Sequence, residues 1–231
     1  MHGDQLPLSI PSHPELDPAA RLPSRIVPML ATAADAPFDA DDHLFEPWWP
    51  GARAWAFVEE GRMRLRTHGL ADALAAFPEL RDLAALLETD GAVIDGTLLV
   101  LDDAGRPDPD LLRARLEEGE WVGSPAFIAS DLLWDRFRPM NRRPFRARRA
   151  RLEAVLPASD RVVVGRGYPR EGRLVAEALA SLGIEALSAR RLDARLRAGS
   201  AGDAWLRVPV APRPDVWERP TLALILRLPL E

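Results

Sequence analysis

Apolar and polar residues alternate in two neighbouring stretches of the chain, Ala54–Glu59 and Arg62–Thr67, which flank Glu60-Gly61. This alternation around a turn predicts a β-hairpin. Apolar residues then recur at helical spacing from Leu74 to Leu87, which predicts an amphipathic helix at about 78–87. Similar patterns predict strands at 98–101, 161–165 and 221–228, and helices at 109–118 (with Asp108 as a cap), 144–155 and 170–181. Hairpins interspersed with amphipathic helices favour an α+β fold.

The two ends of the chain differ from its middle. Residues 1–27 contain five prolines and few large apolar residues, which predicts an extended, Pro-rich N-terminal extension. Residues 28–209 are predicted to form one domain. Residues 210–231 are predicted to form a tail with the single strand at 221–228. An OB-fold needs about five strands, so we expect none in this tail.

Composition limits the class of protein. The chain of 231 residues is 47% hydrophobic and 28% charged, as in ordinary globular domains. No apolar run is long enough to span a membrane, and the N-terminus does not resemble a secretory signal. The absence of cysteine excludes disulfides and cysteine-bound metal. We therefore expect a cytoplasmic protein, with nucleoid association left open. The net charge of −5 argues against a strongly basic nucleic-acid binder.

All 30 basic residues are arginine, and the chain contains no lysine. A genome rich in G and C, which favours arginine codons, explains this, and so does selection against amines that can be modified. Eight arginines fall between positions 136 and 151. They suggest either a phosphate or nucleic-acid contact surface or the solvated face of the predicted helix 144–155. The first alternative would use Arg142, Arg143, Arg146 and Arg149.

The stretch Leu44-Phe45-Glu46-Pro47-Trp48-Trp49-Pro50-Gly51-Ala52-Arg53 resembles the first motif of ATP-dependent DNA ligases, E-x-K-x-D-G-x-R. In that family the lysine attacks the α-phosphate of ATP and carries AMP. Glu46, Gly51 and Arg53 are in register with the motif, whereas the lysine position is Trp48 and the aspartate position is Pro50. An indole N–H only donates a hydrogen bond and is not a nucleophile.

Other segments resemble the same family in the same order, most closely the ligase D group of bacterial end joining, over about 28–208. Pro28-Met29-Leu30-Ala31-Thr32 resembles the opening of its adenylation domain. The third motif, D-G-E, ends in Thr97 after Asp95, and Ser130 stands at the aromatic position of the adenine pocket. The fourth motif keeps Glu185 but has Arg190 for lysine. The fifth motif, W-x-K-x-K, appears as Trp205-Leu206-Arg207-Val208-Pro209.

The resemblance implies a nucleotidyltransferase α+β fold in which antiparallel sheets, flanked by helices, enclose a cleft. It also implies a degenerate nucleotide site made by Glu46, Trp48, Pro50, Gly51, Arg53, Asp95, Thr97, Ser130, Glu185, Arg190 and Arg207. We expect Trp48 to point into the former ATP cleft and fill part of it. The family's ATP and Mg²⁺ are predicted not to bind, because too few anionic oxygens remain. No metal and no catalytic residue are therefore predicted.

The leading hypothesis is a catalytically inactive, ligase-like domain associated with DNA repair, which binds DNA ends or an active ligase or end-joining protein. A second hypothesis is nucleotidyl transfer without a lysyl-adenylate, with His43 or His68 as a substitute nucleophile. A third is an interaction domain unrelated to nucleic acid. The sequence leaves the oligomeric state open.

Overall fold

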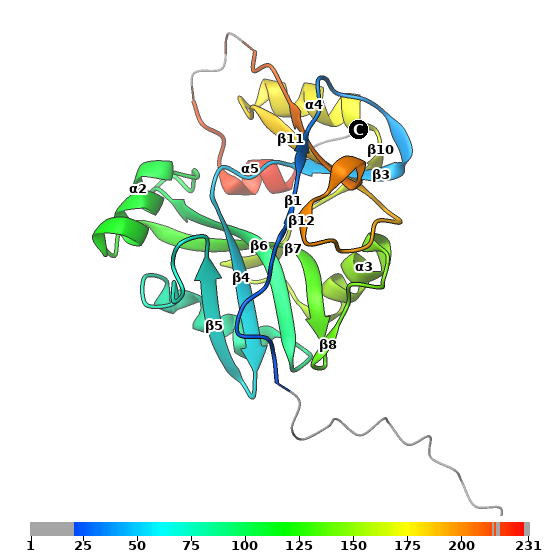
Figure 1. Cartoon of the computed structure of the whole chain (residues 1–231). Coiled ribbons are helices and arrows are strands. Elements are labelled where there is room, and N and C mark those ends of the chain that lie inside the picture. Colours follow the sequence, from blue (N-terminus) through cyan, green and yellow to red (C-terminus); the bar gives the residue numbers. More distant parts are fainter. Residues whose placement is uncertain (1–20, 214, 216–217, 229–231) are drawn as a thin grey trace, which may run out of the picture.

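The predicted hairpin forms one edge of the larger sheet. The computed structural model describes residues 21–213, 215 and 218–228 (Figure 1). Its six-stranded sheet has the order β5-β4-β6-β7-β8, and β9 pairs with β7 in parallel. The hairpin supplies the first two strands and is confirmed. The strands are β4 (Ala52–Glu59), β5 (Arg62–Thr67), β6 (Ala92–Leu101), β7 (Ser124–Asp135), β8 (Arg138–Pro139) and β9 (Val162–Val164).

A second sheet has five strands in the order β10-β3-β11-β13-β2. Its strands are β10 (Tyr168–Arg170), β3 (Ala40–Pro47), β11 (Ala186–Arg191), β13 (Trp205–Pro209) and β2 (Thr32–Ala33). Short β1 (Met29–Leu30) pairs with β12 (Gly199–Ser200). The long strand pairs are antiparallel, as expected, whereas β1–β12, β2–β13 and β7–β9 are parallel. The sheets are therefore mixed.

The helices flank these sheets. The predicted helix at 78–87 is instead two short pieces, the 3₁₀ helix η1 (Pro78–Asp82) and α1 (Leu83–Leu86). The second piece ends at Leu86 because the backbone is extended at Leu87. The other three predicted helices are present. Asp108 caps α2 by accepting from two backbone N–H groups. These helices are α2 (Pro109–Arg113) with the π-helical turn η2 (Ala114–Glu118), α3 (Phe145–Val155) and α4 (Gly172–Ser181).

The predicted strand at 221–228 is wrong, because this segment contains the helix α5 (Leu222–Leu226). The Thr221 hydroxyl accepts a hydrogen bond from the Leu224 N–H and caps the helix. Leu222 and Ile225, three residues apart, are both buried. A short apolar run does not by itself distinguish a strand from a helix. The described residues beyond 209 contain no strand and hence no OB-fold.

Two hydrophobic cores lie on opposite faces of the six-stranded sheet. Ile94, Leu98 and Val100 of β6 belong to one core, with η1 and α1, whereas Leu99 belongs to the other, with α4 and α5. The five-stranded sheet therefore packs over part of one face, and a cleft opens where this second core ends. The short 3₁₀ helix η3 (Gly202–Ala204) precedes β13.

The N-terminal extension is only partly described. Residues 1–20 lie outside the described residues, so their predicted extended structure stays a prediction. Residues 21–27 lie against the domain, because Leu22 and Ile26 pack with Trp55 and Phe57 on the six-stranded sheet. The boundary at residue 27 therefore does not coincide with the start of the packed structure. Among the described residues, no helix has the length and apolar character needed to cross a membrane.

Candidate functional site

A cavity of about 450 Å³ lies between the two sheets, and it brings together nine of the eleven residues predicted for the nucleotide site. Its lining residues come in part from six strands: β3, β4, β6, β7, β11 and β13. Gly51 is required here, because a Cβ atom would lie 2.1 Å from the Leu98 carbonyl oxygen. The nine residues are Glu46, Trp48, Gly51, Arg53, Asp95, Thr97, Ser130, Arg190 and Arg207.

The other two predicted residues, Pro50 and Glu185, line a second cavity of about 330 Å³. Trp48 and Arg207 line both cavities and so separate them. The Glu185 side chain is exposed. The tertiary structure therefore removes Glu185, a candidate acidic ligand, from the larger cavity.

Asp95, the retained carboxylate of the third motif, is held by Arg53. The guanidinium donates two parallel hydrogen bonds of 2.9 and 2.6 Å to the Asp95 oxygens, and a third of 2.5 Å to the Met29 carbonyl. Burial alone lowers the pKa of Arg53, but the adjacent Asp95 carboxylate outweighs this effect and raises it. Because Asp95 is only 3% exposed and already paired, it is not a free ligand for a metal ion.

Glu46, retained from the first motif, is held by Arg149 of α3. Arg149 Nη1 donates to Glu46 Oε1 at 2.8 Å and to the Ser130 carbonyl at 3.1 Å. Its Nε donates to Glu153 at 2.9 Å, and Nη2 donates to the Gly165 carbonyl. Burial lowers the pKa of Arg149, but the two carboxylates outweigh burial and raise it.

This position corrects one prediction about the arginine run. Arg149 is 5% exposed, so it is an internal partner of Glu46 rather than a surface contact for phosphate. Neither proposed alternative for the run, a contact surface or a solvated helix face, describes this residue. Arg142, Arg143 and Arg146 are exposed, as both alternatives require.

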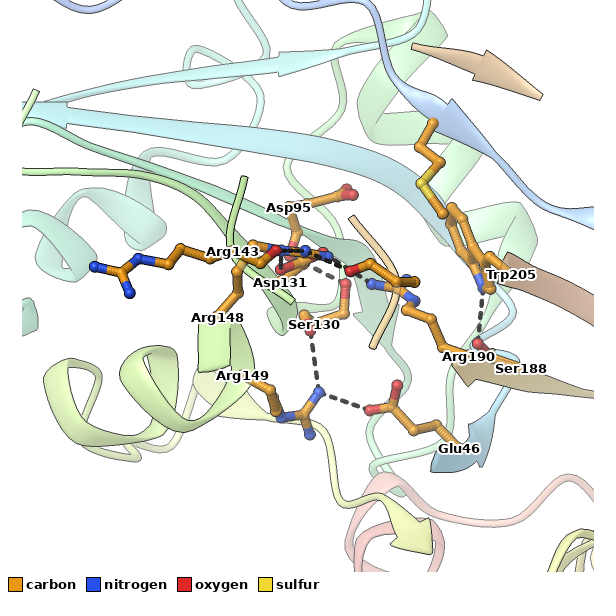
Figure 2. Close-up of polar contacts among 12 residues, drawn as sticks. Glu46, Asp95, Ser130, Asp131, Arg143, Arg148, Arg149, Ser188, Arg190 and Trp205 are labelled. Carbon is orange, nitrogen blue, oxygen red and sulfur yellow. Dashed lines mark hydrogen bonds and ion pairs between the residues drawn. The ribbon is translucent and has the colours of Figure 1, made fainter. Parts of the chain in front are cut away.

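A third buried ion pair, between Asp131 and Arg148, was not predicted as part of the site. Arg148 Nε and Nη2 each donate to Asp131 at 2.8 Å, and Arg190 Nη1 lies 3.2 Å from the same carboxylate (Figure 2). Burial lowers the pKa of Arg190, and its Nε has no partner. Arg148 belongs to the arginine run and Asp131 follows Ser130, but only the packing of α3 against β7 shows that they pair.

Trp48, which the sequence predicts at the nucleophile position, is part of a stack of aromatic and cationic side chains. Its ring centroid lies 6.0 Å from that of Trp205 with the planes inclined by 31°, and the Arg207 guanidinium lies 5.4 Å from the Trp48 ring. Arg190 and Arg53 lie 4.1 and 4.8 Å from the Trp205 ring. Trp48 is half-buried and lines the cavity, as expected, but an open volume remains beside it.

The groups in the cavity do not fit a metal–triphosphate site. Thr97 supplies no charge, and the Ser130 hydroxyl donates to the Asp95 carbonyl at 3.1 Å. Among the described residues, no three His, Cys, Asp or Glu side chains form a cluster that could hold a metal ion. Mg²⁺ prefers several hard oxygen ligands around it, including substrate phosphates. The residues that line the cavity therefore do not fit ATP bound together with Mg²⁺.

The two histidines considered as substitute nucleophiles do not line the cavity. His43 is buried against the rings of Phe38 and Phe45, and its Nδ1 is hydrogen-bonded to Asp42 at 2.7 Å. His68 is exposed after β5. Neither side chain is placed to reach a phosphate bound in the cleft.

The chain is similar in sequence to multifunctional end-joining proteins named LigD. It is 30% identical over 183 residues to LigD of Mycobacterium tuberculosis and 28% identical over 188 residues to LigD of Mycolicibacterium smegmatis. These alignments cover 79% and 80% of this chain but only 24% of either relative. The chain therefore spans about a quarter of the length of these curated relatives. No family model matches the chain.

The fold is similar to that of a solved structure, the ligase domain of M. tuberculosis LigD. The TM-score is 0.68 at 28% identity, and the alignment covers 80% of this chain and 59% of the solved one. The comparisons of sequence and of fold thus point to the same relative. The chain is homologous to the ligase domain of LigD and has the nucleotidyltransferase fold of ATP-dependent DNA ligases.

Proposed function

We propose that this chain is a catalytically inactive, ligase-like domain that serves DNA repair by binding DNA ends, alone or with an active end-joining protein. The observation that carries the proposal is the internal pairing of the former active-site carboxylates. Asp95 forms an ion pair with Arg53, and Glu46 forms one with Arg149. The chain also contains no lysine. The residues that would be needed for nucleotide chemistry thus stabilise the domain.

Inactivity is supported by the need for both a nucleophile and a metal-bound triphosphate in adenylate formation. Covalent catalysis requires an activated nucleophile within reach of the phosphorus atom. Phosphoryl-type transfer also depends on Mg²⁺ to neutralise charge on the phosphates. Trp48 can act neither as the nucleophile nor as a ligand of Mg²⁺. The buried carboxylates of Asp95 and Glu46 are paired with the guanidinium groups of Arg53 and Arg149.

DNA association is supported by homology to an end-joining protein and by the exposed arginines near α3. The homology is to the ligase portion of LigD, so the scaffold is one that handles DNA in its relatives. A domain that keeps this scaffold without its reacting groups is suited to binding rather than to joining.

Adenylation is tested by incubating the chain with [α-³²P]ATP and Mg²⁺ and measuring label that stays on the protein through denaturing gel electrophoresis. The ligase domain of M. tuberculosis LigD serves as the positive control. We expect label on the control and none on this chain. Label on this chain would overturn inactivity and point to a substitute nucleophile.

DNA association is tested separately by fluorescence anisotropy with a blunt 20-base-pair duplex at about 0.05 M salt. We expect saturable binding that weakens as salt is added, as for contacts to phosphate. A flat titration at low salt would overturn the DNA-binding part of the proposal and leave the question of catalysis unaffected.

A further inference from the structure

Seven exposed arginines gather around the β7–β8 turn, the start of α3 and the loop after β11. Within the described part of the chain, none of their side chains has a carboxylate partner. The segments 136–146 and 195–197 contain no acidic residue. We call these residues the arginine surface: Arg136, Arg138, Arg142, Arg143, Arg146, Arg195 and Arg197.

Backbone hydrogen bonds hold these separate segments together. The N–H groups of Phe145 and Arg146 donate to the carbonyls of Ala194 and Leu192 at 2.8 and 2.9 Å. Leu196, between the two loop arginines, packs in the same apolar cluster as Phe137 of the β7–β8 turn. The seven guanidinium groups therefore project from one continuous region, with α3 and β8 on the same side of the molecule in Figure 1.

The buried Arg148 links the segments of this region through hydrogen bonds to their backbone. Its Nη1 donates to the carbonyls of Arg143 and Ala194 at 2.7 and 3.0 Å, while its other nitrogens hold Asp131. Arg148 thus joins the α3 segment to the loop segment. Because these backbones are fixed, less entropy is lost when the exposed side chains engage a partner.

The charge of this region is opposite to that of the rest of the chain. The net charge of the whole sequence is −5, and the arginine surface carries +7, so all other residues together carry −12 (−5 minus 7). Arg146 also lies in the first turn of the eleven-residue helix α3, where the helix dipole is positive and a cation is unfavourable. An anionic partner would relieve both sources of repulsion.

We propose that the arginine surface binds the phosphate backbone of duplex DNA without reading its base sequence. This inference rests on the proposed function and adds the surface and the kind of contact. Arginine binds phosphate bidentately, and an array of unpaired guanidinium groups releases counterions when phosphates replace them. The arginine surface lies next to the cleft, because the guanidinium of Arg190 in the cleft lies 4.7 Å from the ring centroid of Phe145 at the start of α3. A duplex bound to the arginine surface therefore lies beside the former active site.

The test compares matched variants of the full chain by fluorescence anisotropy with the blunt 20-base-pair duplex. One variant carries Arg142→Gln, Arg143→Gln and Arg146→Gln, and a second carries Arg195→Gln and Arg197→Gln. A control variant carries Arg81→Gln, Arg161→Gln and Arg227→Gln, which remove three exposed arginines elsewhere. Circular dichroism and urea midpoints establish that all three variants fold like the parent.

Each DNA phosphate that an arginine no longer neutralises lowers the slope of log Kd against log salt by about 0.9. We therefore expect the slope to fall by about 3 in the α3 variant and by about 2 in the loop variant, with binding at low salt weakened at least about tenfold in each. In the control variant the slope should fall by less than about 1.

The outcomes separate this inference from the function on which it rests. A parent chain that does not bind DNA would overturn both. A parent chain that binds, with α3 and loop variants no weaker than the control variant, would overturn the arginine surface and leave DNA binding by the domain in place. Equal binding of the parent to poly-glutamate at the same salt would overturn the assignment to DNA and favour an acidic protein partner.

Discussion

Asp131 on β7 accepts two parallel hydrogen bonds of 2.8 Å from Arg148 and lies 3.2 Å from a second guanidinium, that of Arg190. By its resemblance to the fourth ligase motif, the sequence predicts that Arg190 replaces a lysine of the nucleotide site. In this chain it is held by a buried carboxylate and by the Trp205 ring instead. The buried pair of Arg190 on β11 with Asp131 on β7 therefore joins the two sheets.

Replacing Asp131 with asparagine should strongly destabilise the domain. Two guanidinium groups that are at most 4% exposed would lose the carboxylate that they share. Removing one partner of a buried ion pair costs about 3–5 kcal/mol. Urea unfolding followed by tryptophan fluorescence measures the loss. Asp203→Asn is the control, because this exposed partner of Arg191 should contribute less than about 1 kcal/mol. Equal midpoints for the two variants would contradict the prediction.

Restoring the nucleophile alone should not restore adenylation. In Trp48→Lys, the amine would return, but Pro50, Thr97 and Ser130 would still leave the nucleotide without its usual support. Placement accounts for effective molarities of about 10⁵ M or more, so loss of orientation removes most of the rate. We expect no label from [α-³²P]ATP on this variant after denaturing gel electrophoresis.

Adding Pro50→Asp and Thr97→Glu to Trp48→Lys is the smallest set from which we expect a trace of label. The triple variant without Mg²⁺ is the control for non-specific labelling. Strong labelling of the single variant would show that the cleft still orients ATP, and would refute the argument from lost placement.

ATP with Mg²⁺ should bind the parent chain only weakly. The cavity is large enough for a ligand, at about 450 Å³, but its carboxylates are paired with Arg53 and Arg149. We expect a dissociation constant above about 1 mM, which corresponds to less than about 4 kcal/mol of binding free energy. Isothermal titration calorimetry measures this directly, with the ligase domain of M. tuberculosis LigD as reference. A micromolar constant would exclude this account of the cleft.

The domain should lose stability in acid. A hydrogen bond from His43 lowers the pKa of Asp42 below its ordinary 3.8. For Glu79 and Asp108, burial raises the pKa, but the hydrogen bonds from Arg115 and Arg219 outweigh it, so both values fall below their ordinary 4.5 and 3.8. Below about pH 4.5 the unfolded chain therefore binds more protons than the folded chain, and stability falls as pH falls.

The pH dependence is measured by urea midpoints between pH 7 and pH 3. The variant Asp42→Asn, Glu79→Gln, Asp108→Asn removes the three titrating groups, while asparagine at 108 still caps α2. Its midpoint should decline less steeply in acid than that of the parent. Parallel declines would assign the acid sensitivity to other carboxylates.

Local patterns in the sequence predicted most elements correctly where a short-range signal exists. The hairpin at β4–β5, the cap at Asp108 and the helices α3 and α4 depend on neighbouring residues, and these were predicted. The segment at 222–226 was wrongly predicted as a strand, because five apolar residues fit either structure and tertiary packing decides between them. The order of the motifs likewise predicted one shared site, and nine of its eleven residues line one cavity. Nothing in the sequence indicated that Glu185 lines a different cavity.

The sequence by itself determined that this chain cannot form a lysyl-adenylate, because a covalent intermediate requires a particular atom and no lysine is present. Only the tertiary structure decided what the remaining charged groups do. Ion pairs such as Arg149 with Glu46 join residues 103 positions apart, so they depend on how strands and helices come together rather than on any local pattern. Burial then makes each pairing obligatory, since an unpaired charge in the interior is strongly unfavourable.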